Sequence, residues 1–136
     1  MATLRSLVGL ILFAIALVVA AHTMLEPLFH TSTEANPFSP LWGTIDALMA
    51  AAVVLGVIFS YLHKRGAAGE AALAANILFY GFLFVGILFF RNWFDYLRPA
   101  YDGPPVEVVG LTWVFIDAAL PLLSSVLGLY LLRKRT

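Results

Sequence analysis

The chain contains no cysteine and few charged residues, which make up only 12% of its 136 positions. The absence of cysteine excludes a disulfide-stapled secreted domain and a thiolate zinc module. Soluble domains carry about 25% charged residues, so the charges present here cannot cover a water-facing surface. The net charge is zero, because 8 basic residues balance 8 acidic ones. The sequence therefore lacks the basic patch that would indicate nucleic-acid binding.

Apolar residues account for 62% of the chain, and its mean hydropathy is +0.93. A membrane-spanning helix needs roughly 20 mostly apolar residues, because the hydrocarbon core is about 30 Å thick. Four segments meet this requirement, at about residues 4–25, 41–62, 71–90 and 106–132. Proline and glycine gather between them. The sequence therefore predicts an all-α, integral membrane four-helix bundle, as a single transmembrane domain over residues 1–136.

The orientation follows from the positions of lysine and arginine, which favour cytoplasmic loops. In a four-span hairpin topology, six of the eight basic residues share the side of the two termini: Arg5, Lys64, Arg65, Arg133, Lys134 and Arg135. Only Arg91 and Arg98 fall on the other side. We therefore expect both termini in the cytoplasm. The preference for arginine over lysine and the abundant alanine favour a bacterial inner (cytoplasmic) membrane.

The first segment has a second interpretation. Residues 1–21 have a basic start, an apolar run and small residues at Ala20 and Ala21, a pattern that is typical of signal peptides. Cleavage there would leave three spans, with the new N-terminus outside. We take the retained first helix as the expectation.

A short sequence pattern occurs twice. Trp42 precedes Asp46 by four residues, and Trp113 precedes Asp117 by four, within the shared pattern W-x-x-I-D-A. The match favours a parallel duplication of a helical hairpin. Chance similarity in so apolar a chain is the alternative.

The two aspartates fall at matching depths. Asp46 precedes Lys64 by about 27 Å of helix, and Asp117 precedes Arg133 by about 24 Å, at a rise of about 1.5 Å per residue. Both carboxylates are therefore expected near the outer boundary of the apolar core. If they face each other, one is expected to hold a proton at neutral pH, because close like charges cannot both stay ionised.

Two readings of this pair remain open. A carboxylate inside a membrane span is costly and marks ion or substrate pathways, which makes Asp46, Asp117 and the nearby Arg91 candidate coupling groups. In the structural reading, each aspartate lies near the positive N-terminus of its helix. Arg91 or Arg98 would then neutralise either carboxylate.

Pro121 is the one proline well inside a predicted span. Because it lacks a backbone N–H, we expect it to kink the last helix. The hydroxyls of Ser124 and Ser125 are expected to satisfy the carbonyls that it frees.

His22, Glu26 and His30 follow one another at four-residue intervals. On an unbroken helix they would share one face, and imidazole and carboxylate groups suit a transition metal. Pro27 interrupts this pattern and is expected to break the helix. We therefore predict no metal site, with these three residues as the set that would form one.

Small residues recur at Ala52, Gly56 and Ser60, four apart on the second predicted helix. Such faces let helix backbones approach closely in lipid. They predict a packing interface, within the chain or with partner subunits.

No self-sufficient catalytic set is present, so we do not expect an enzyme, and we expect no cofactor beyond bound lipid. The predicted function is a non-catalytic accessory subunit of a larger membrane complex of respiratory, photosynthetic or oxygenase type. Its partners would be the bilayer and other membrane subunits or copies of itself, and not nucleic acid. The alternative is a small ion- or proton-coupled transporter or channel that uses Asp46 and Asp117.

Overall fold

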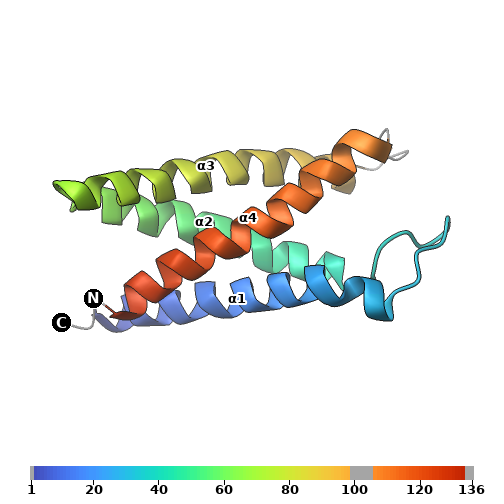
Figure 1. Ribbon diagram of the computed structural model, residues 1–136, viewed down its shortest axis with the longest axis horizontal. Coiled ribbons are helices and arrows are strands. Elements are labelled where there is room, and N and C mark those ends of the chain that lie inside the picture. Colours follow the sequence, from blue (N-terminus) through green and yellow to red (C-terminus); the bar gives the residue numbers. More distant parts are fainter. Residues whose placement is uncertain (1, 99–105, 134–136) are drawn as a thin grey trace.

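The computed structural model describes residues 2–98 and 106–133, and side chains from residues 3–98 and 110–133 (Figure 1). Within these ranges the chain forms four helices: α1 (Ala2–Phe29), α2 (Trp42–Arg65), α3 (Glu70–Leu97) and α4 (Val106–Arg133). Each contains a stretch that is long and apolar enough to cross a membrane. The all-helical prediction with four spanning-length helices is confirmed. Lys134 and Arg135, used in the orientation argument, lie outside the described residues.

Two helix ends differ from the prediction. Helix α1 continues through Pro27 to Phe29, because a proline in the last turn removes only one intrahelical hydrogen bond. Helix α3 runs on to Leu97, so Arg91 lies on the helix and not in a loop. The length of an apolar run reflects the thickness of the bilayer, and a helix can continue beyond the run. The next proline in the sequence is Pro99, so no proline stops α3 before Leu97. Arg98 already has the extended conformation that a residue before proline adopts.

The four helices pack as a bundle in which the described start of α1 and end of α4 lie at the same end (Figure 1). Helix α1 packs on α4, α2 packs on α3, and α2 and α4 also touch each other. Among the described residues, α1 and α3 share no interface. Helices α2 and α4 therefore form the inner pair of the bundle, and α1 and α3 flank them.

Glycines set the two closest approaches. A methyl group at Gly9 of α1 would lie 2.8 Å from the carbonyl oxygen of Gly128 in α4. A methyl group at Gly56 of α2 would overlap the Phe82 ring of α3. Both contacts bring helices together without side chains in between, which is the packing mode available where the hydrophobic effect is weak.

The interior and the surface of the bundle are both apolar. Leu12, Met49, Phe82 and Ile116 are completely buried in a continuous core. Large apolar side chains also face outward from the middle of the helices, such as Ile87, which is 69% exposed. Exposure of so large an apolar surface to water would be unfavourable for a monomer, whereas lipid chains would solvate it.

Candidate functional site

Glu26 anchors the loop between α1 and α2 to the end of α1. The backbone N–H of Ser39 donates to its Oε1 at 2.8 Å. The indole Nε1 of Trp42 donates to the same carboxylate, 3.0 Å from each oxygen. One carboxylate therefore holds both Ser39 and Trp42, which follow Glu26 by 13 and 16 residues in the chain.

His22 lies one turn before Glu26, packed under the same tryptophan. Its ring meets Trp42 edge-on at 4.6 Å between centroids and contacts Phe29 at 5.4 Å. Only 8% of the residue is exposed. Its Nε2 atom is buried and has no hydrogen-bond partner among the described residues. A buried polar atom without a partner is costly, so this nitrogen indicates a place where a ligand or water could bind.

Asp46 and Asp117 are both buried, at 7% and 8% exposure. Asp117 lies within electrostatic range of Asp46 and of Glu26. Its Oδ1 atom has no hydrogen-bond partner in the part of the chain that the structure describes. We refer to His22, Glu26, Asp46 and Asp117, from three helices, as the acidic site.

The helix register places His22 and Asp117 at one level of the bundle. Gly9 and Gly128 touch where the antiparallel helices α1 and α4 meet. From that contact, His22 is 13 residues along α1 and Asp117 is 11 residues back along α4, or about 20 and 17 Å of helix. Both residues therefore stand at similar heights, near the end of the bundle that carries the α1–α2 loop.

Pro121 adds a second oxygen to the site. Helix α4 is continuous through Pro121, but proline has no N–H to donate to the carbonyl of Asp117, four residues earlier. The expected rescue by serine is wrong: Ser125 donates to the carbonyl of Leu122 at 3.0 Å, and the buried hydroxyl of Ser124 has no described partner. Asp117 therefore offers two oxygens: a side-chain Oδ1 without a described hydrogen-bond partner, and a backbone carbonyl that receives no hydrogen bond from residue 121 or from either serine.

The two structural explanations for Asp117 both fail. Arg91 and Arg98 lie at 3.8 and 3.3 Å from the carboxylate of Asp95 and form ion pairs with it. The sequence shows Arg91 and Asp95 one helical turn apart, a spacing at which opposite charges pair. Asp117 also lies three turns inside α4, whereas the charge of a helix N-terminus acts within the first turn. Asp46, one turn into α2, remains close to its N-terminus.

The metal-ligand set is not assembled. His30 follows the end of α1, and its Nε2 lies 3.1 Å from the carbonyl oxygen of Asn36. Glu26 is taken by Ser39 and Trp42, and the buried Nε2 of His22 has no hydrogen-bond partner among the described residues. Among the described residues, no group of three His, Cys, Asp or Glu is arranged to hold a metal ion.

The small-residue face of α2 is buried inside the chain. Ala52, Gly56 and Ser60 are enclosed by the bundle, and the Phe82 ring fills the notch at Gly56. The hydroxyl of Ser60 donates to the carbonyl of Val57. This face therefore packs within the chain and is not available to a partner subunit.

The fold and the site together define a class: a bundle of four helices, each long and apolar enough to span a membrane, with a buried acidic site near one end. Comparison with known proteins takes the identification no further. No family model, no curated protein and no solved structure matches this chain.

Proposed function

We propose that this chain is an integral membrane protein that binds a proton or a small cation at the acidic site and couples that binding to transport. Asp117 is the coupling group, and Asp46 and Glu26 supply the surrounding negative charge. One observation carries the proposal: the buried Oδ1 of Asp117 lacks a described partner while two further carboxylates act on it.

The cost of the arrangement supports a functional role. Carboxylates within the apolar part of a membrane protein are expensive, and they are retained mainly in ion or substrate pathways. The described cations do not neutralise the site, since Arg91 and Arg98 pair with Asp95. Three acidic groups in one place favour the binding of positive charge, and carboxylate and carbonyl oxygens are ligands that hard cations accept.

Transport would require the bundle to open between the acidic site and the end opposite the α1–α2 loop. Beyond the acidic site the core is closed by Met49 and Leu120, which are 0% and 1% exposed. Pro121 follows Asp117 by one turn, and prolines inside helices are common hinge points. We infer that movement of α4 about Pro121 would expose Asp117 alternately to the two sides.

The helix contacts support the hairpin duplication as part of this proposal. In a duplicated hairpin, α3 corresponds to α1 and α4 corresponds to α2. The α1–α4 interface then corresponds to the α3–α2 interface, and both interfaces are present. The α2–α4 contact maps onto itself under this correspondence. A pseudo-two-fold axis between α2 and α4 would relate Asp46 to Asp117.

Proton or cation flux in proteoliposomes tests the function. Asp117→Asn and Asp46→Asn remove each charge with little change of shape, and the double variant removes both. Asp95→Asn is the matched control, because it neutralises a carboxylate outside the acidic site. We expect flux to fall in the first three variants and to persist in the control. Equal flux in the double variant and the unmodified protein would sink the proposal.

The location of the protein is part of the same proposal: the bacterial inner membrane, with both termini in the cytoplasm. The chain lacks cysteine, so a single introduced thiol reports its own position. Ser32→Cys in the α1–α2 loop is expected to react with a membrane-impermeant thiol reagent in intact spheroplasts. Labelling that requires lysis would reverse the orientation.

An accessory subunit remains the second candidate, favoured by one surface feature. Phe84 of α3 and Phe115 of α4 form an exposed edge-on aromatic pair, with ring centroids 6.0 Å apart. A helix of a partner subunit could pack on this pair as well as lipid does. A mild-detergent pull-down with native mass measurement decides, because a co-purifying complex that Phe84→Ala disrupts would support this candidate over the transporter.

A further inference from the structure

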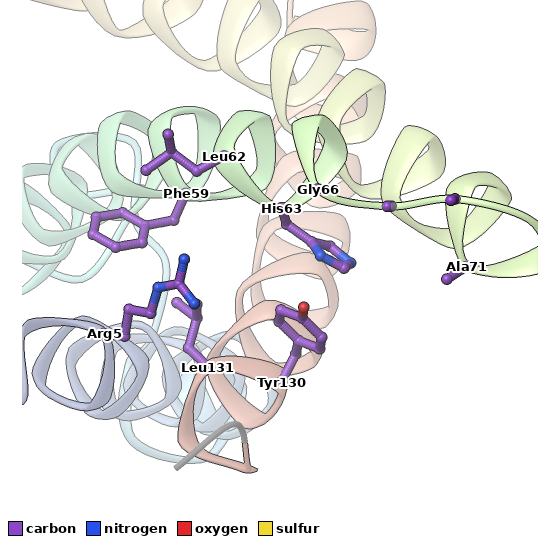
Figure 2. Close-up of a pocket in the computed structure, with 10 residues that line it drawn as sticks. Arg5, Phe59, Leu62, His63, Gly66, Ala71, Tyr130 and Leu131 are labelled. Carbon is purple, nitrogen blue, oxygen red and sulfur yellow. The ribbon is translucent and has the colours of Figure 1, made fainter. Parts of the chain in front are cut away.

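A second polar feature lies at the opposite end of the bundle and is independent of the acidic site. A pocket of about 350 Å³ opens where the start of α1, the end of α2 and the end of α4 meet. Figure 2 shows Arg5 from α1, Phe59 and His63 from α2, and Tyr130 from α4 around it. The sequence alone does not predict this pocket, because its residues come from segments that are far apart in the chain.

Arg5 brings a cationic side chain to the pocket. The guanidinium of Arg5 points into it (Figure 2) and forms no hydrogen bond or ion pair with another described residue. By contrast, the nearby Lys64 is engaged, since it donates to the Tyr80 hydroxyl at 3.0 Å. Of the acidic residues that the structure describes, only Glu70 lies at this end of the bundle. The pocket therefore favours an anion at Arg5.

The walls of the pocket are apolar. Phe59 and Leu131 line it beside Arg5, and the rings of His63 and Tyr130 contact each other at 4.0 Å between centroids, tilted by 38°. Arg5 is the fourth residue of α1, about 5 Å from the helix start at a rise of about 1.5 Å per residue. In a membrane this is the level of the headgroups. A ligand that satisfies both features has an anionic group and a hydrocarbon part.

We propose that this pocket binds one anionic phospholipid, with the lipid phosphate on the Arg5 guanidinium and an acyl chain along Phe59 and Leu131. Basic pockets between membrane helices are suited to anionic headgroups. Free phosphate shares the anionic chemistry, but it would leave the apolar walls without a partner. The occupant is therefore the lipid.

Native mass spectrometry of the delipidated full chain tests the proposal, by titration with phosphatidylglycerol or phosphatidylcholine. We expect Arg5→Gln to weaken binding of the first phosphatidylglycerol about tenfold, as for one lost charge-assisted hydrogen bond. Ala71→Phe, which keeps the charge and fills one side of the pocket, is expected to weaken it as well. Arg65→Gln is the control, because it removes the same charge at this end without lining the pocket.

Three outcomes overturn the proposal. Equal weakening by Arg5→Gln and Arg65→Gln would show diffuse attraction and no site. Equal affinity for phosphatidylcholine and phosphatidylglycerol would remove the role of the anionic charge. Displacement of the lipid by millimolar inorganic phosphate would show a site for the free anion.

Discussion

The notch at Gly56 gives the sharpest test of the packing described above. In Gly56→Ala, the new methyl group would overlap the Phe82 ring, which is completely buried. Overpacking of this kind costs about 1–3 kcal/mol. Alanine also gains up to about 1 kcal/mol over glycine in a helix interior. The variant is therefore expected to lose about 0–3 kcal/mol overall, and about 1–3 kcal/mol relative to the same change at an uncrowded helical glycine.

Gly43 provides that reference, because a methyl group there meets nothing within 4 Å. Unfolding in mixed micelles with increasing SDS, followed by tryptophan fluorescence, measures both variants. Gly56→Ala is expected to unfold at a lower SDS fraction than Gly43→Ala. Adding Phe82→Leu to Gly56→Ala is expected to cost less than the sum of the two single changes, because residues in contact are coupled. Identical midpoints for Gly56→Ala and Gly43→Ala would refute the packing argument.

Two further predictions concern the loop anchor and the α1–α4 contact. Trp42→Phe removes the donor to Glu26 and is expected to cost about 1.5–3 kcal/mol, the worth of a hydrogen bond to a charged group. Limited proteolysis should then cut the α1–α2 loop faster, and an unchanged rate would count against the anchor. Gly128→Ala is expected to destabilise more than Gly81→Ala in the same SDS titration, because its methyl group meets the Gly9 backbone while the other meets a flexible leucine tip. The reverse order would contradict the close approach.

The sequence predicted the helices well because their signal is local. Apolar runs of membrane length and the prolines and glycines between them define four helices without any tertiary information. Asp46 and Asp117 could be singled out for the same reason, since a carboxylate inside an apolar run is visible in the sequence alone.

The contacts of the site could not be predicted in the same way. Glu26 holds Ser39 and Trp42 across a loop, and no period or motif predicts a contact between residues 13 and 16 positions apart. The partner of Arg91 was within reach of a local rule, because Asp95 follows it by one turn. The pocket at Arg5 depends on which helices become neighbours, and that is a property of the folded bundle.

The anchoring carboxylate has a consequence for how the acidic site is reached. Glu26 holds the α1–α2 loop through Ser39 and Trp42, and it also contributes to the electric field at Asp117. A cation that draws on Glu26 must compete with the two donors that close the loop. Loading the site and releasing the loop would then share one carboxylate. The mobility of the α1–α2 loop would thereby report whether the acidic site is filled.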